Sequence, residues 1–93
     1  MYQKYVVSIN FDLCLGYVLD IPYNKQYMVK LIADDVVVSY AEDVSQQQAT
    51  IIINANDIAA VNAVIKGSPL AQYWQCQISE MPAENTENTT NLA

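Results

Sequence analysis

The segment from residue 36 to residue 56, VVVSYAEDVSQQQATIIINAN, constrains the fold more than any other part of the chain. It reads as two β-branched strands that are joined by a polar reversal. Because Ile51, Ile52 and Ile53 are consecutive, the second strand should bury both of its faces. We therefore expect this strand inside a sheet, with other elements covering it on each side.

Two further strands, which show alternating apolar and polar residues, bring the predicted number to four. The four strands fall at about residues 5–11, 36–41, 49–55 and 73–79, and a loose polar loop over residues 42–48 joins the second strand to the third. The third strand holds the consecutive isoleucines, whereas the fourth carries Gln75 and Gln77 on one side. The third strand should therefore be central, and the fourth should lie at an edge.

Two helices are expected between these strands. The first lies within residues 13–35, where Pro22 leaves two alternatives: the helix begins at Pro22 with Asp20 as its N-cap, or it runs from about residue 13 and kinks. The second is expected over residues 57–66, with Asn56 as its N-cap and Gly67 as its stop. Ile58, Val61 and Ile65 in this helix should face the core.

The resulting order is β-α-β-β-α-β, which is the ferredoxin-like arrangement of the α+β class. Right-handed crossovers then place the first and third strands in the centre of a four-stranded antiparallel sheet, with both helices on one face. We expect a single domain over residues 1–81. Residues 82–93 have no apolar periodicity and are expected to form a flexible acidic and polar tail.

The two faces of the predicted sheet differ in character. Residues expected to face the helices are Tyr5, Val7, Ile9, Phe11, Val36, Val38, Tyr40, Ile51, Ile53, Trp74, Cys76 and Ile78. Residues expected on the opposite face are Val6, Ser8, Asn10, Val37, Ser39, Thr50, Ile52, Asn54, Gln75 and Gln77. This mixture is too apolar for water and too polar for a dry core, so two such faces from identical chains could cover one another.

Length also favours association. A chain of 93 residues buries only about 60–65% of its unfolded surface, so burial against a partner subunit would add stability. We therefore expect a homodimer, with a higher oligomer left open.

Charge and composition exclude several kinds of function. The formal charge is −6, from ten carboxylates and four lysines, and the sequence contains no arginine and no histidine. The charge disfavours binding to nucleic acid and to acidic membranes. The absence of histidine removes Ser-His and Cys-His nucleophiles, imidazole metal ligands and axial haem histidines. We expect no metal and no cofactor.

The two cysteines, Cys14 and Cys76, are far apart and lack CxxC spacing. We expect them to be reduced and to pack as small hydrophobic residues, and not to form a disulfide. The chain begins directly with a strand pattern and contains no stretch long enough to span a bilayer. A cytoplasmic location is the resulting expectation.

Several short motifs, in their order along this topology, resemble the muconolactone isomerase-like branch of the dimeric α+β barrel superfamily. They extend over residues 4–81 and are Ile21-Pro22, Val38-Ser39-Tyr40, Ile53-Asn54-Ala55, and Ser68-Pro69-Leu70 followed by Tyr73. The resemblance implies a homodimer whose two sheets face each other and a small-molecule pocket between the helices and the sheet. Many relatives use histidine or arginine in that pocket, and this chain has neither.

Two side chains are candidates for proton transfer beside a carbonyl group, because desolvation brings a carboxyl pKa toward neutrality. They are Asp20, which precedes Ile21-Pro22, and Tyr40, at the end of the second strand. The competing interpretation makes Asp20 a helix cap and Tyr40 a core aromatic residue with a bonded hydroxyl. Aromatic residues that could line a pocket, or simply pack in the core, are Tyr17, Tyr27, Tyr40 and Trp74.

Two pairs of adjacent carboxylates, Asp34-Asp35 and Glu42-Asp43, are read as solvated loop ends, because a hard-metal site needs more oxygen ligands. Two hypotheses for function follow. In the first, the protein is a small homodimeric barrel that binds, or also isomerises, a small cyclic or aromatic metabolite. In the second, it is a non-catalytic domain for self-association or for docking to another protein.

Overall fold

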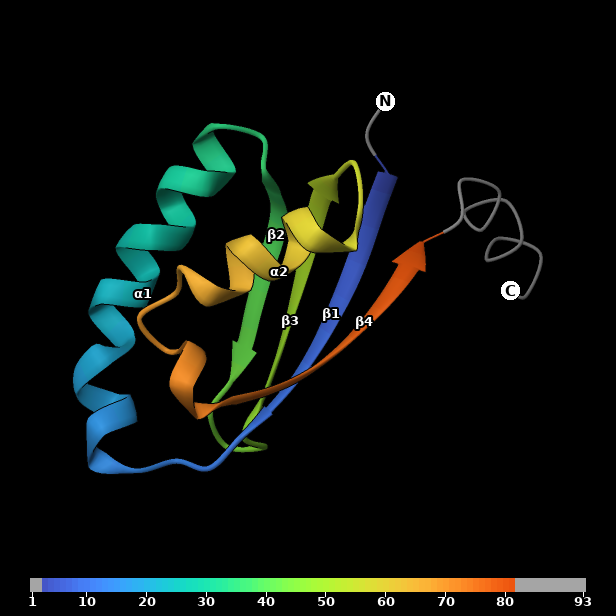
Figure 1. Ribbon diagram of the computed structural model, residues 1–93. Helices are drawn as coiled ribbons and strands as arrows, with labels where there is room; N and C mark the ends of the chain where they lie inside the picture. Colours follow the sequence, from blue (N-terminus) through green and yellow to red (C-terminus); the bar gives the residue numbers. More distant parts are fainter. Residues whose placement is uncertain (1–2, 82–93) are drawn as a thin grey trace, which may run out of the picture.

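The predicted strands form one antiparallel sheet in the computed structural model, which describes residues 3–81 (Figure 1). The strand order is β2-β3-β1-β4, so the first and third strands are central, as predicted. Every neighbouring pair is antiparallel. The bounds are β1 (Gln3–Phe11), β2 (Val37–Asp43), β3 (Gln48–Ala55) and β4 (Trp74–Met81). The tail predicted over residues 82–93 lies outside the described residues.

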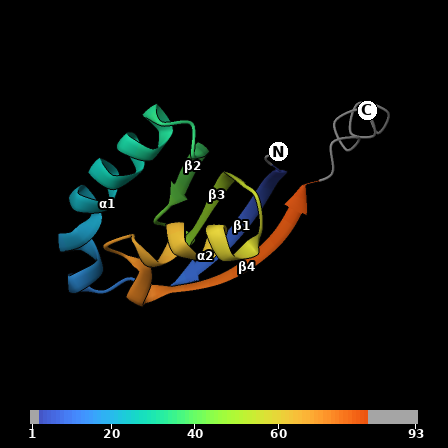
Figure 2. The same cartoon turned by 45° about the horizontal axis from the view of Figure 1, so that its top comes forward.

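Two helices cover one face of the sheet and leave the other face open (Figure 2). They are α1 (Leu15–Ala33), which contacts β2, and α2 (Ile58–Lys66), which contacts β3. A short 3₁₀ turn, η1 (Ala71–Tyr73), leads into β4. The element order and the layers confirm the ferredoxin-like α+β fold.

Helix α1 is continuous through its proline. It begins at Leu15, after Cys14, and contains Pro22 in its interior. The alternative with Asp20 as an N-cap is therefore wrong. The alternative of one helix that includes Pro22 is confirmed, with a start at Leu15 and not at about residue 13. An internal proline costs about 3 kcal/mol; burial of Tyr17 and Met28 against the sheet offsets that cost.

The end of α1 is a Schellman motif. Asp35 adopts a left-handed conformation, with φ of 61°. The Val36 amide donates to the Leu31 carbonyl at 2.9 Å, and the Asp35 amide donates to the Ile32 carbonyl at 3.1 Å. The chain thereby turns sharply from α1 into β2.

Helix α2 is capped one residue later than predicted. Asp57, and not Asn56, is the N-cap, and its Oδ1 accepts from the Ala60 amide at 2.9 Å. The sequence offers two adjacent residues that can cap, and the backbone conformation at Asp57 decides between them. The helix ends at Gly67 as predicted, with φ of −75°, so glycine is not needed there for a left-handed turn.

A β-bulge changes which side of β2 faces the helices. The pairing with β3 shifts between Val37, opposite Ile53, and Ser39, opposite Ile52, so Val38 is the extra residue. As a result Val37 is buried and Val38 is 44% exposed. The prediction that Val38 lies in the core and Val37 on the other face was wrong, because strict alternation has no place for an inserted residue.

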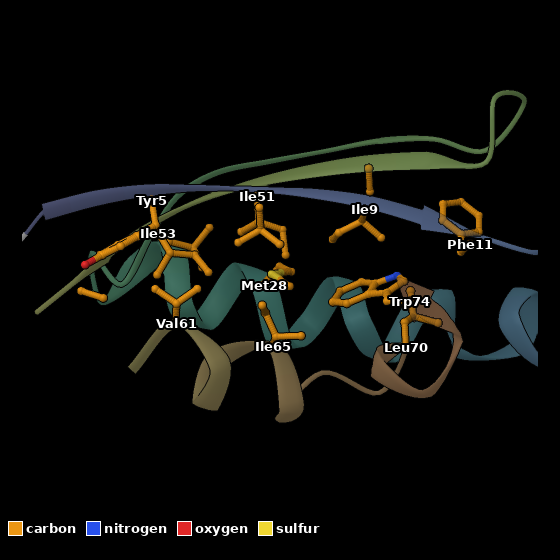
Figure 3. Packing of buried hydrophobic residues seen from close by; sticks show 14 of the residues in the cluster. Tyr5, Ile9, Phe11, Met28, Ile51, Ile53, Val61, Ile65, Leu70 and Trp74 are labelled. Atoms are coloured by element: carbon orange, nitrogen blue, oxygen red, sulfur yellow. The ribbon is translucent and has the colours of Figure 1, made fainter. Parts of the chain in front are cut away.

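The core lies between the sheet and the two helices (Figure 3). Tyr5, Ile9, Ile51 and Ile53 point from the strands toward Met28 on α1 and toward α2, as Figure 3 shows. Val36, Tyr40, Cys76 and Ile78 are partly buried against this cluster. Cys14 contradicts expectation, since its thiol is exposed; both cysteines are free.

Candidate functional site

Aromatic and polar side chains gather between α1 and the end of the sheet where β1 stops and β4 starts. We call this group the phenol cluster and define it as Tyr17, Asn24, Tyr40, Glu42, Ser68 and Trp74. Its members come from α1, from β2, from the loop after α2 and from β4. The cluster is therefore assembled from segments that are far apart in the sequence.

Tyr17 is the centre of the cluster. Its side chain is fully buried, and its hydroxyl donates to Glu42 Oε2 at 2.5 Å and accepts from Trp74 Nε1 at 3.3 Å. Its ring stacks on Phe11 with centroids 4.2 Å apart and meets Tyr73 edge-on at 5.5 Å. Stacking and hydrogen bonding together fix the ring in one position.

Asn24 forms the second part of the cluster. Its Nδ2 donates to the Tyr40 hydroxyl at 3.1 Å, and its Oδ1 accepts from Ser68 Oγ at 2.6 Å. Ser68 Oγ in turn accepts from the Leu70 amide at 3.0 Å. This chain of bonds ties α1 to β2 on one side and to the loop before η1 on the other.

Both phenols have raised pKa values. Burial raises the pKa of Tyr17, and the adjacent Glu42 carboxylate raises it further. Burial likewise raises the pKa of Tyr40, and the charge of Glu42 acts in the same direction. At neutral pH both hydroxyls are protonated, so they serve as hydrogen-bond donors and not as bases. Glu42, which is partly exposed, is the acceptor of the cluster.

The structure gives the two proton-transfer candidates different surroundings. Tyr40 lies in the phenol cluster. Asp20 lies on α1 and is partly exposed. It takes part in none of the hydrogen bonds of the phenol cluster. Burial raises the pKa of Tyr73, and the charge of Asp20 raises it further.

Three of the four predicted pocket residues come together. Tyr17, Tyr40 and Trp74 all belong to the phenol cluster, whereas Tyr27 lies against α2 and donates to the Val64 carbonyl at 2.7 Å. Asn24, Glu42 and Ser68 were not predicted as site residues. The sequence could have indicated Asn24 as a site residue. It lies on the core-facing stripe of α1 with Tyr17, Ile21, Met28 and Leu31, where a polar side chain needs hydrogen-bond partners.

The polar atoms of the cluster are satisfied. Among the buried side-chain nitrogen and oxygen atoms of residues 3–81, each has a hydrogen-bond partner. A ligand that entered the phenol cluster would have to replace bonds that are already made. The cluster is thus well ordered before any ligand arrives.

The carboxylate pair Glu42-Asp43 has two separate structural roles. Glu42 accepts from Tyr17. Asp43 holds the β2–β3 turn, because its Oδ1 accepts from Ser45 Oγ at 2.6 Å and from the Gln46 amide at 3.1 Å, and these bonds lower the pKa of Asp43. An open hollow of about 190 Å³ adjoins both residues at this turn. No cluster of three or more His, Cys, Asp or Glu that could hold a metal occurs in the described part of the chain.

The open face of the sheet carries the residues predicted for it except Val37, which is buried in the core. Exposed members are Ser8, Asn10, Ser39, Thr50, Gln75 and Gln77, and partly buried members are Val6, Ile52 and Asn54. Asn54 uses its Nδ2 to donate to the Asp35 carbonyl at 2.8 Å. The bulge adds Val38 to the exposed surface of β2.

Pairing between strands arranges these side chains in rows across the sheet. One row runs through Ala41, Thr50, Ser8 and Gln77, and the next runs through Ser39, Ile52, Val6 and Ser79. Neither row contains a charged residue. The centre of the open face is therefore neutral, on a protein whose formal charge is −6.

Within residues 3–81, neither α1 nor α2 is long and apolar enough to cross a membrane. No protein-family model matches the chain, and no curated protein matches it significantly.

Proposed function

We propose that the protein is a homodimeric α+β barrel in which two copies pair through the open faces of their sheets. The observation that carries the proposal is the pair of neutral rows on the open face. Val6 and Ile52 supply apolar area there, and the neighbouring hydroxyls and amides can hydrogen-bond across a contact. Because these rows are uncharged, two acidic copies can approach each other there without bringing carboxylates together.

As the barrel's function we propose the binding of a small cyclic or aromatic metabolite between the helices and the sheet, as in the muconolactone isomerase-like proteins. The phenol cluster is the site that we assign to it. Tyr17 and Tyr40 offer protonated hydroxyls, Glu42 offers an acceptor, and Phe11 and Trp74 offer apolar surface. Such a site suits an uncharged ring that carries a carbonyl or hydroxyl group.

Isomerisation of that metabolite is the enzymatic form of the proposal. Tyr40 would donate a hydrogen bond to the carbonyl oxygen, because its raised pKa keeps the hydroxyl protonated, and Asp20 is the candidate base. Since Asp20 takes part in none of the hydrogen bonds of the phenol cluster, we place binding ahead of catalysis. A cytoplasmic location fits the two free thiols, because a reducing compartment preserves them.

The satisfied hydrogen bonds of the phenol cluster favour a second candidate, a non-catalytic domain that only self-associates or docks to a partner. In that case the cluster is a structural network that locks α1 onto the sheet. The first candidate and the self-associating form of the second both require the open face to pair, so self-association is the first property to measure.

Light scattering after size exclusion tests the pairing. The wild-type protein is expected to show twice the chain mass of 10.4 kDa. Replacement of two open-face residues, Ser8→Glu with Thr50→Glu, places two carboxylates opposite each other in one neutral row. This variant is expected to give the monomer mass. The matched control Asn62→Glu, on the exposed side of α2, should leave the dimer intact. A wild-type monomer, or a control that dissociates as the open-face variant does, would contradict the proposal.

Calorimetric titration with muconolactone and with catechol distinguishes the two candidates. Metabolite binding predicts heat with at least one probe, and Tyr40→Phe should weaken it by about tenfold through loss of one hydrogen bond. Tyr23→Phe, on an exposed tyrosine of α1, is the control. No heat from either probe with an intact dimer would favour the non-catalytic domain.

A further inference from the structure

Helix α1 has a second apolar face, on the side away from the sheet. We call it the outer face of α1; its residues are Leu15, Val18, Leu19, Pro22, Tyr23, Val29 and Ile32. Leu15 is 73% exposed, Leu19 62% and Val29 59%. Residues of the outer face recur at intervals of three, four or seven positions, as Leu15, Val18, Leu19 and Pro22 do. This spacing places them on one side of the helix, opposite Tyr17, Asn24 and Met28.

Helix α2 shows what an ordinary surface helix of this protein looks like. It turns Val61 and Ile65 inward and exposes mainly alanines, together with Asn62 and Lys66. Its one strongly exposed large apolar residue is Ile58. The outer face of α1 is therefore not explained by a general tolerance of exposed hydrophobic residues in this fold.

The charge on the outer face is opposite to that of the protein as a whole. Lys25 and Lys30, two of the four lysines in the chain, are exposed on this side of α1. The only carboxylate within Leu15–Ala33 is Asp20, which lies at the flank of the helix and is partly buried. An acidic protein thus presents a surface that is apolar and positively charged.

The surface is also hollowed at its middle. An open hollow of about 530 Å³ is lined by Pro22, Lys25, Gln26, Val29 and Lys30. Pro22 has no amide hydrogen, so the carbonyl of Val18, four residues earlier, lacks its usual helical donor. Apolar surface and two lysine side chains therefore meet at this hollow.

We propose that the outer face of α1 binds an amphipathic helix of another protein, with an apolar stripe flanked by carboxylates. A stripe of leucine-like side chains would cover Leu15, Leu19 and Val29, and one of them would fill the hollow. The flanking carboxylates would pair with Lys25 and Lys30. The 19 residues of α1 make about five turns, which is enough length for such a pairing.

Charge decides among the possible occupants. A second copy of α1 would bring lysines against lysines, with no carboxylate on its own outer face to meet them. An anionic membrane would attract this face but repel a protein whose net charge is −6. An acidic amphipathic helix satisfies both the apolar stripe and the two lysines. The site is separate from the open face of the sheet, which lies in the other layer (Figure 2).

Fluorescence anisotropy with designed peptides tests the proposal on the full chain. The probe is a labelled helical peptide of about five turns with leucine at every third or fourth position and glutamate on both flanks; the matched peptide has lysine in place of glutamate. The glutamate peptide is expected to bind at least about tenfold more tightly than the lysine peptide. Lys25→Glu with Lys30→Glu should weaken it about tenfold, and Leu19→Asn should weaken it by a similar factor.

The control variant is Lys66→Glu, which reverses one lysine charge on α2 and should leave the affinity unchanged. Equal binding of both peptides, or equal loss in the control, overturns the proposal. Two further outcomes also overturn it. In one, Leu19→Asn converts a wild-type dimer into a monomer, so that a second copy occupies the face. In the other, the protein sediments with phosphatidylglycerol vesicles, loses this binding when Lys25 is replaced, and does not bind the glutamate peptide.

Discussion

Asn24 holds the segments of the phenol cluster together. It is only 1% exposed, yet it bonds to Tyr40 and Ser68 and so joins three segments of the chain. The sequence places it on an apolar stripe, which marks it as unusual but does not name its partners. Those partners lie 16 and 44 residues away in the sequence. Hydrogen bonds of this kind depend on tertiary structure, so the site could be predicted only in its aromatic members.

Asp35 carries a cost that a single substitution can remove. Its φ of 61° lies in the left-handed region, which glycine occupies without strain, and its carboxylate adds negative charge at the C-terminal end of α1. Asp35→Gly is therefore expected to raise the free energy of unfolding by about 0.5–1 kcal/mol in urea denaturation. The control is Asp34→Gly: with φ of −89°, Asp34 has no such strain. An equal gain in both variants would mean that charge, and not backbone conformation, is responsible.

At the scale of elements, the sequence predicts most of the fold. Alternation identified β1 and β4, β-branched runs identified β2 and β3, and the consecutive isoleucines placed β3 in the centre. The sequence did not predict two local features whose alternatives differ little in energy. They are the extra residue at Val38 and the helix cap at Asp57 in place of Asn56. A bulge costs little at an edge strand such as β2, and periodicity alone cannot locate it.

The contact between α1 and α2 depends on the absence of a side chain at Gly67. A methyl group there would collide with the Tyr27 hydroxyl and lie 3.0 Å from Tyr27 Cζ. Gly67→Ala is expected to lower the free energy of unfolding by about 1–3 kcal/mol, because Tyr27 must move and release the Val64 carbonyl. In a Tyr27→Phe background the same substitution should cost less, since the colliding oxygen is gone. Chemical denaturation of the wild type, the two single variants and the double variant measures the coupling energy between Gly67 and Tyr27. Additive effects of the two substitutions would show that contact with Tyr27 does not cause the loss of stability.

The whole molecule presents two different surfaces in two layers. The open face of the sheet is neutral and mixed, whereas the outer face of α1 is apolar and basic. The phenol cluster lies between the helices and the sheet, and its buried polar atoms are all hydrogen-bonded. A partner on one surface therefore need not compete with a partner on the other.

The phenol cluster also sets how the whole molecule responds to alkali. The pKa values of Tyr17 and Tyr40 are raised above the ordinary 10.0, so the folded protein holds these protons more tightly than the unfolded chain does. Their contribution to stability is complete below pH 10.0 and is lost as pH rises beyond it. The free energy of unfolding should be level up to that point and then fall, with a shallower fall in Tyr40→Phe. Tyr23→Phe, an exposed control, should keep the wild-type slope; an unchanged slope in Tyr40→Phe would contradict this account.

The hydrogen bond from the only tryptophan in the chain to Tyr17 has a practical consequence. The indole is almost fully enclosed and is coupled through one phenol to a carboxylate on another strand. Its ultraviolet emission is thus a built-in optical reporter, whose wavelength and intensity follow any displacement of α1 from the sheet without an attached dye.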